Sequence, residues 1–358
     1  MSSPGYRLVA AARELNLSER FFGRFRRVGL RGVLADLNRV GEHVTVPGEA
    51  PIAGMAWQKD DQDTHRWFPQ GITTSADAYG ADPSGGMFEG HDVVMASWYG
   101  HGWLGWLHFG SRISVIDWSD EGEGPPRYRH VLLVEPRRFL WFHRLRPVRV
   151  HAGGIVWYGK HLFVAGSSNG VRVFRLDDIV RVRNRVRTKG YRYALPQYTL
   201  YVAEQDEGED RMTYSFMSLD RAGDEDHLVG GEYGRKGGSH RLIRYPIDRD
   251  TELLGTDDDG RAVPVDFHDR QIARMQGAVV ADGTWFVTSS NGEGNPGDLW
   301  SGTPGDFTRH RGVLPTGPED ITYLPQRRWL WSLTEWPGRR WVYAIDADRW
   351  RTGPNDPS

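Results

Sequence analysis

The sequence predicts an all-β fold, a β-propeller of about five four-stranded blades with an N-terminal helical extension. Three observations predict it. Short apolar runs alternate with Gly, Asp, Asn and Pro from about Trp67 onward. Aromatic residues and glycine are abundant, with 15 Trp, 14 Tyr, 14 Phe and 44 Gly, and these types suit half-buried pleated surfaces and tight turns. A β-meander pattern also recurs along the chain, which indicates radial repetition.

The repeat is a polar residue, a small residue or Asp, an apolar run, a turn and a second apolar run. Its copies begin at Gln70, Gly153, Tyr214, Gln276 and Glu319. Second strands are expected within 93–99, 161–170, 227–234, 285–292 and 328–336, and third strands within 113–118, 171–176, 241–247, 298–302 and 340–346. The spacing between copies is uneven, so long loops must carry the excess residues.

Three regions follow from this pattern. Residues 1–50 form a helical extension, with apolar residues spaced for helices over 13–40 and a strand at 42–48 that closes the ring. Residues 51–350 form the propeller. Residues 351–358 are polar and rich in proline, and we expect a disordered tail.

Composition indicates which partners, metal sites and cellular compartment to expect. The net charge of −2 implies no field for nucleic acid. The absence of Cys excludes disulfides and Cys-ligated zinc. No stretch is apolar enough for a membrane span or a signal peptide, so a cytoplasmic protein is expected, a monomer or weak dimer that binds a small molecule.

Two glycine motifs lack the context that their chemistry needs. GHGWLG at 100–105 would need a following helix to bind a dinucleotide, and GSSNG at 166–170 would need one to present Ser168 as a nucleophile. A strand is expected after each motif instead. Neither motif therefore predicts a site.

The candidate site comes from position in the repeat. The starts of the innermost strands crowd one mouth of a propeller's channel, so equivalent residues converge there. Glu319 and Glu335 are the candidate acid and base, with Glu232 as a further candidate and His151 as a proton relay. Residues expected to bind substrate are Gln70, Tyr214, Gln276, Trp98, Tyr99, Trp336, Asn169 and Asn291. The alternative is that these polar groups only satisfy backbone groups and hold water.

A calcium ion is a second interpretation of the same position. Glu319, Asp320, Asn169 and Asn291 would supply the oxygen ligands that Ca²⁺ prefers. This ligand set resembles that of gluconolactonase- and paraoxonase-type propellers, which implies a Ca²⁺-dependent lactonase-like hydrolase. The leading expectation is no cofactor.

Longer segments carry a broader resemblance. The strings at 151–179, 191–201, 276–292 and 317–346 are similar to a group of uncharacterised actinobacterial β-propeller proteins, often described as hypothetical or secreted. The resemblance covers roughly residues 65–346 and implies the fold and an actinobacterial source. It implies no activity and no catalytic residue.

The sequence thus predicts a small-molecule enzyme of specialised metabolism with acid–base chemistry in the central funnel. Cyclisation, isomerisation, elimination and hydrolysis are all compatible with such a site. A propeller that binds carbohydrate or another small ligand without catalysis is the rival hypothesis. Dissimilar residues at the matching repeat positions favour one asymmetric central site over several equal ones.

Overall fold

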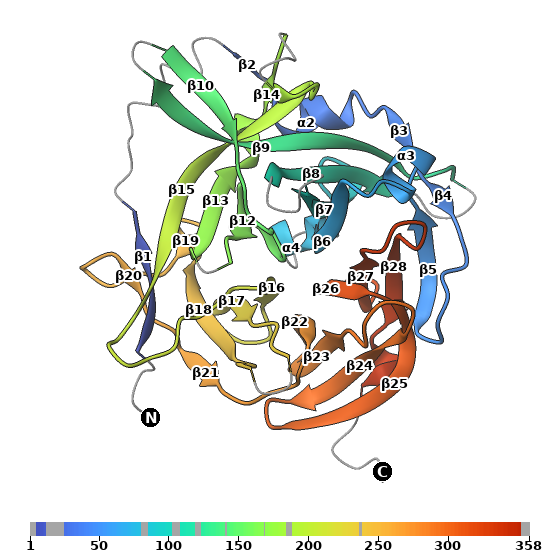
Figure 1. The fold of residues 1–358 in the computed structure, drawn as a ribbon, viewed down its shortest axis with the longest axis vertical. Coiled ribbons are helices and arrows are strands. Elements are labelled where there is room, and N and C mark those ends of the chain that lie inside the picture. The colour runs from blue at the N-terminus through green and yellow to red at the C-terminus, as the bar shows by residue number, and fades with distance from the viewer. Residues whose placement is uncertain are drawn as a thin grey trace.

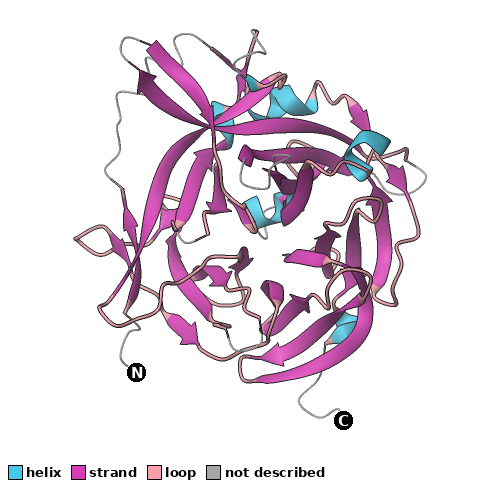
Figure 2. Ribbon diagram, in the orientation of Figure 1, coloured by secondary structure: helices cyan, strands magenta, loops and turns pink. Residues whose placement is uncertain are grey.

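The chain is mostly β, and its sheets are arranged around a central axis as in a β-propeller (Figure 1). The computed structural model describes residues 5–11, 25–79, 85–101, 108–118, 123–139, 142–167, 169–183, 188–235 and 238–351. Ser168 and most of the GHGWLG motif lie outside these residues. The described helices are short and lie at the ends of strands (Figure 2).

Two antiparallel meanders share a 14-stranded sheet. The first is β6 (Trp67–Thr74), β7 (Asp92–His101), β8 (His108–Trp118) and β9 (Arg127–Phe139). The second is β11 (Ile155–Tyr158), β12 (His161–Ala165), β13 (Val171–Arg175) and β15 (Tyr193–Gln205). The long outer strands β9 and β15 join them by running parallel over 132–134 and 194–196.

Three further sheets follow along the chain. One contains β16 (Phe216–Asp220), β17 (Asp226–Gly231), β18 (Leu242–Asp248), β19 (Leu253–Leu254) and β21 (Asp266–His268). The next is β22 (Met275–Ala281), β23 (Thr284–Ser289), β24 (Pro296–Thr303) and β25 (Asp306–Thr316). The last is β26 (Pro318–Leu324), β27 (Trp329–Thr334), β28 (Trp341–Asp346), β5 (Pro51–Ala56) and β4 (Glu42–His43). Because two meanders share one sheet, the count of about five blades stays a prediction.

The last sheet is completed by the N-terminal part of the chain. β5 pairs antiparallel with β28, with Met55 opposite Val342 and both side chains buried. The strand that pairs with β28 is therefore at 51–56 and not at the predicted 42–48. Of that segment, only Glu42–His43 is a strand, and it pairs with the outer edge of β5.

The remaining elements are short strands and helices. The short strands are β1 (Tyr6–Ala10), β2 (Arg26–Arg27), β3 (Arg39–Val40), β10 (Phe142–Pro147), β14 (Val180–Arg181) and β20 (Arg261–Ala262). The helices are α2 (Gly29–Leu34), α3 (Lys59–Gln62), α4 (Ser75–Tyr79) and the 3₁₀ turns Leu176–Asp178 and Asp348–Trp350. Of these, α4 directly follows the innermost strand β6 near the axis (Figure 1). Of the helices expected over 13–40, the described part contains α2 alone, and residues 12–24 lie outside it.

Apolar side chains fill the spaces between neighbouring sheets. Between the second meander and the β16–β18 sheet, for example, Phe163 and Val173 pack against Met217 and Tyr245, all of them fully buried. Successive side chains of a strand point to opposite faces of its sheet, so each sheet directs apolar side chains toward both neighbouring sheets. Burial of the apolar surface on both faces stabilises the ring.

The innermost strands approach one another closely at the axis, and glycine permits this. A Cβ atom on Gly154 would lie 1.9 Å from the backbone nitrogen of Met217, and one on Gly277 would lie 2.7 Å from the Cα atom of Asp320. Both residues occupy the small-residue position of the repeat. The backbone contact brings the residues beside them together near the axis.

Candidate active site

Glu319 and Glu335 form a hydrogen-bonded pair of carboxyl groups. Glu319 lies in β26, the innermost strand of its sheet, and is 3% exposed. Glu335 directly follows β27, the next strand of the same sheet, and is half-buried. The pair therefore has a buried member and a member that solvent reaches.

Two glutamine amides hold this pair from neighbouring sheets. Nε2 of Gln276 donates to Oε1 of Glu319 at 3.0 Å, and Nε2 of Gln70 donates to Oε2 of Glu335 at 3.1 Å. Gln70 also donates to the carbonyl oxygen of Pro69. The structure thus brings together four of the residues predicted from position in the repeat.

The environment of the pair favours protonation. Burial raises the pKa of Glu319 well above its usual range, and the negative charge of Glu335 raises it further. Burial also raises the pKa of Glu335, while hydrogen bonds from Gln70 and Glu319 oppose that rise. We infer that Glu319 carries the proton and that its O–H group donates a hydrogen bond to the Glu335 carboxylate, as in other carboxyl pairs that share a proton.

An aromatic group lies beside the pair. Burial raises the pKa of the Tyr99 hydroxyl, and the nearby charges of Glu335 and Glu319 add to this. The Tyr99 ring stacks on Phe68 at 5.6 Å between ring centroids and contacts the ring of His151 at 4.2 Å. His151 is itself exposed. Tyr99 is buried, so His151 is the member of this group that solvent reaches.

Asp320 has a structural role that the sequence did not predict. Its Oδ2 accepts a hydrogen bond from the backbone N–H of Ile72, a residue of β6, at 3.1 Å. Backbone N–H groups of Ile155 and Ile321 lower the pKa of the same carboxyl, although burial raises it well above its usual range overall. Asp320 thereby ties together three innermost strands at the axis.

Glu232 is not part of the pair. Its carboxylate accepts hydrogen bonds from Nε and Nη2 of Arg241 at 2.5 and 2.8 Å and from the backbone N–H of Thr213 at 2.7 Å. Both Glu232 and Arg241 are buried. This bidentate ion pair occupies both carboxylate oxygens of Glu232. We therefore assign Glu232 to the framework.

Trp98 is also a framework residue. Its indole is fully buried, donates to Oγ of Ser114 at 2.7 Å and packs edge-on against Trp57. Because side chains alternate along β7, Trp98 points away from the face that Tyr99 occupies. Trp98 therefore does not line the site together with Tyr99.

Trp336 stays next to the pair. It follows Glu335 in the chain, is half-buried, and lies over Gly317, where a Cβ atom would be 2.2 Å from the indole ring. Gly317 also has a φ of +66°, which glycine adopts without strain. This close approach fixes the loop that carries Glu335, because the N–H of Glu335 donates to the carbonyl oxygen of Gly317.

The other predicted binding residues have partners of their own. The Tyr214 hydroxyl is buried and hydrogen-bonded to the Tyr245 hydroxyl at 2.6 Å. The Asn291 side chain donates to the carbonyl oxygen of Pro296 at 2.8 Å, and Asn169 is exposed in the loop between β12 and β13. Among the described residues, no group of three or more His, Cys, Asp or Glu is placed to hold a metal ion.

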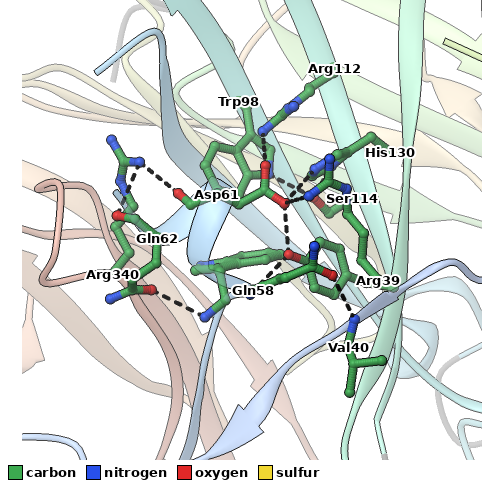
Figure 3. Close-up of polar contacts among 12 residues, drawn as sticks. Arg39, Val40, Gln58, Asp61, Gln62, Trp98, Arg112, Ser114, His130 and Arg340 are labelled. Carbon is green, nitrogen blue, oxygen red and sulfur yellow. Dashed lines mark hydrogen bonds and ion pairs between the residues drawn. The ribbon is translucent and has the colours of Figure 1, made fainter. Parts of the chain in front are cut away.

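A second polar cluster lies at Asp61 and was missed by the sequence reasoning (Figure 3). The Asp61 carboxylate is 3% exposed and accepts hydrogen bonds from Arg39 at 2.8 Å, Arg112 at 3.0 Å, the Tyr128 hydroxyl at 2.7 Å and His130 Nε2 at 3.0 Å. The positive charge around it keeps its pKa well below the usual range despite burial. Its sequence context, a polar run in a short helix, carries no signal of burial.

The same cluster contains a Ser–His–Asp line, yet its geometry is not that of a nucleophile. Ser114 Oγ lies 2.9 Å from Nδ1 of His130, whose Nε2 donates to Asp61. Ser114 is fully buried and already accepts the indole N–H of Trp98. A nucleophilic serine must be reachable by substrate. The line therefore orders the cluster, and burial with the charge of Arg112 lowers the pKa of His130 to about 4.

Arg340 connects this cluster to the carboxyl pair. Its Nη1 donates to the carbonyl oxygen of Asp61 at 2.7 Å, and its Nε donates to the carbonyl oxygen of Glu335 at 2.7 Å. Burial and the charge of Arg112 lower the pKa of Arg340 to about 10. Arg340 thus links the Asp61 cluster to the strand end that carries Glu335.

Comparison with known proteins adds only distant likenesses. No protein-family model matches the chain, and no curated protein matches its sequence. The structure is similar to the β-propeller domain of Cps50 from Myceliophteria thermophila, at 11% identity and a TM-score of 0.35, over 70% of this chain and 93% of that one. It is also similar to a GH43_1 enzyme from Xanthomonas citri, at 11% and 0.38, over 79% and 88%. A third is the RS223 β-xylosidase, at 10% and 0.38, over 80% and 93%.

Likeness at this level of identity and superposition carries no argument about activity. The resemblance to actinobacterial and lactonase-type propellers also stays a prediction. No helix within the described ranges combines the length and the apolar character that crossing a bilayer requires.

Proposed function

We propose that the chain is an enzyme that performs acid–base chemistry on a small molecule at the Glu319–Glu335 pair. The contact between Glu319 and Glu335, with each carboxyl group held by a glutamine amide, supports the proposal. Two carboxyl groups in contact cannot both ionise readily, so the pair retains one proton at pH values at which isolated glutamates have lost theirs. A retained proton beside a solvent-accessible carboxylate is what general acid–base catalysis requires.

The two glutamates would have different roles. Glu335 is half-buried, so it would take a proton from the substrate or from a bound water and return it later in the reaction. Glu319 is 3% exposed and would hold the shared proton behind Glu335 as a positioning residue. Gln70 and Gln276 would fix the orientation of the two carboxyl groups through the hydrogen bonds that they donate.

Tyr99 and His151 would complete the site beside the carboxyl pair. Tyr99 keeps its hydroxyl proton at neutral pH, because burial and the carboxyl pair both raise its pKa. It could therefore donate a hydrogen bond to a substrate oxygen without being ionised. The exposed ring of His151 would stack on a bound molecule or relay its proton.

The contact between the carboxyl groups separates this site from the usual glycosidase arrangement. A hydrogen bond places two carboxyl oxygens within about 3 Å of each other. Retaining glycosidases hold their carboxyl groups about 5 Å apart, and inverting enzymes hold them farther apart to admit a water. Proton transfer within one small molecule, or hydrolysis with a water activated by Glu335, suits the observed pair better.

Two activity assays on the whole chain test the proposal. Lactones and activated esters probe hydrolysis, and hydrogen–deuterium exchange of ketones in D₂O probes proton abstraction. We expect the wild type to turn over at least one class and Glu335→Gln to lower kcat by about 10²–10⁴-fold. Glu225→Gln is the matched control, because that side chain is 76% exposed. Turnover that survives in Glu335→Gln, or no turnover in either assay, would contradict the proposal.

The same assays weigh the two rival functions. Activity that disappears with a calcium chelator and returns with Ca²⁺ would support the lactonase-like alternative. Sugar binding by a wild type that shows no turnover would support a carbohydrate-binding propeller. An actinobacterial role in specialised metabolism belongs to the same proposal and depends on the substrate class that these assays identify.

A further inference from the structure

A cavity lies on the first meander, next to the Asp61 cluster. It has a volume of about 300 Å³, and its cationic lining residues are Arg39, Arg112, Arg129, Lys189 and Arg192. This volume is at the lower end of the range for small-molecule sites. β3 pairs with residues 127–128 of β9, and β15 pairs with residues 132–134. The cavity lies beside residues 129–130 of β9, between the segment that pairs with β3 and the segment that pairs with β15.

Positive charge dominates the cavity. Asp61 pairs with Arg39 and Arg112, and Asp36 pairs with Arg129 and Arg192. Five cations and two carboxylates leave an excess of three positive charges among the described contacts. His130 also lines the cavity and is neutral at pH 7, since burial and Arg112 lower its pKa to about 4.

Arg112 is prepared to bind an anion. Its side chain is 5% exposed, and its guanidinium lies 4.5 Å from the ring centroid of Trp67 and 4.6 Å from that of Trp98. Nη2 donates to Asp61 and Nη1 donates to the Tyr191 hydroxyl, but Nε has no hydrogen-bond partner among the described residues. A buried guanidinium held between two indoles loses little freedom when it binds.

The rim of the cavity carries the more exposed cations. Lys189 is exposed in the loop between β14 and β15, and Arg192 is 29% exposed. A hydrogen bond from Thr188 Oγ1 to the carbonyl oxygen of Tyr191 closes this loop at 2.5 Å. Lys189 has a φ of +50°, a strained conformation of the kind that often occurs at ligand sites. The rim cations and the buried Arg112 therefore line the same cavity.

We propose that this cavity binds a small anionic ligand through a dianionic phosphoryl group. Donors from β3, β8, β9 and the β14–β15 loop surround the cavity, and guanidinium groups bind the oxygens of a tetrahedral phosphoryl group in pairs. A single carboxylate would balance only one of the three excess charges. None of the lining residues belongs to the carboxyl pair, so this proposal goes beyond the proposed function and does not depend on it.

Calorimetric titration of the full chain at pH 7 and low salt tests the proposal. The probes are inorganic phosphate, glycerol phosphate as a monoester, and acetate as a monoanion. We expect saturable binding of one phosphate per chain that weakens as salt is added, and at least tenfold weaker binding of acetate. Tighter binding of glycerol phosphate than of phosphate would identify a monoester as the ligand class, and the reverse would identify the free ion.

Variants at the rim make the test specific to this cavity. The double variant Lys189→Gln/Arg192→Gln should bind phosphate at least tenfold more weakly and keep its fold, because Lys189 is exposed and Asp36 keeps its ion pair with Arg129 when Arg192 is replaced. Arg270→Gln is the matched control, since that side chain is 94% exposed and distant in the chain. Glu335→Gln should bind phosphate like the wild type. No saturable phosphate binding, or equal binding by the double variant, would overturn the proposal.

Discussion

Replacement of Glu319 by Gln should flatten the pH dependence of stability. In the folded wild type, the pKa of Glu319 lies well above its usual range, so the pair keeps a proton that the unfolded chain loses above about pH 5. A raised folded pKa stabilises the protein fully below the unfolded pKa, and this stabilisation is lost as the pH rises through the folded pKa. The amide of the Glu319→Gln variant has no proton to lose, yet it can still donate to Glu335.

The size of the effect follows from linkage. One proton more in the folded state costs about 1.4 kcal/mol of stability for each pH unit above the unfolded pKa. An unfolding entropy of about 2.1 cal/mol/K per residue gives about 0.75 kcal/mol/K for 358 residues. The melting temperature of Glu319→Gln relative to the wild type should therefore rise by about 2 °C per pH unit, until Glu319 ionises.

Thermal melts of both proteins in half-unit steps from pH 5.5 to 8.5 measure this difference. Asp320 and Asp77 also have raised pKa values, but they are present in both proteins and largely cancel. Glu207→Gln is the control, because Glu207 is exposed after β15, and its difference from the wild type should stay constant. A constant offset between Glu319→Gln and the wild type would refute the idea of a retained proton.

Three further substitutions test the framework around the site. Glu232→Gln should lower the free energy of unfolding by about 3–5 kcal/mol, because it leaves Arg241 buried without its carboxylate, and chemical denaturation measures this. Met55→Ala in β5 should cost about 2–5 kcal/mol in the same assay, whereas Ile52→Ala on that strand, 47% exposed, should cost under about 0.5 kcal/mol. Ser114→Ala should cost about 1–3 kcal/mol and leave turnover unchanged, since it removes a buried hydrogen-bond partner and no nucleophile. Equal losses for Met55→Ala and Ile52→Ala, or turnover abolished by Ser114→Ala, would contradict these assignments.

The repeat in the sequence was sufficient to place the carboxyl pair. Glu319 and Gln276 occupy the same position in two copies, and that position predicts convergence at the axis, where the structure joins them by a hydrogen bond. Gln70 follows the same rule and reaches Glu335. The position of a residue within a repeated strand can be identified from the sequence, so the sequence was enough to predict that Gln70, Gln276 and Glu319 lie near the axis.

Two site predictions failed for reasons of direction and of pairing. Trp98 and Tyr99 are neighbours on β7, and strand alternation allows only one of them to face the site. Glu232 has the right location in its repeat, but Arg241 lies opposite it after folding. The first failure was avoidable from the period of two along a strand. The second depends on the side chain opposite Glu232, because the β17–β18 hairpin places Arg241 beside it.

The Asp61 cluster could not have been found from the sequence. Its members come from β3, α3, β8 and β9. Strand register relates Ser114 to His130 across β8 and β9, and Arg39 to Tyr128 across β3 and β9, but Asp61 in α3 belongs to neither pairing. Asp61 itself lies in a run of polar residues that is typical of a surface turn. The burial of this carboxylate results from packing between elements, not from local pattern.

Glu319 and Glu335 should share one proton at neutral pH. Infrared difference spectroscopy of the wild type against Glu319→Gln, at pH 7 in H₂O and in D₂O, measures it most directly. A protonated carboxylic acid gives a C=O stretching band that shifts in D₂O and is distinct from the carboxylate bands. We predict this band in the wild type, and its loss in Glu319→Gln. A wild type whose two glutamates give only carboxylate bands at pH 7 would contradict the account.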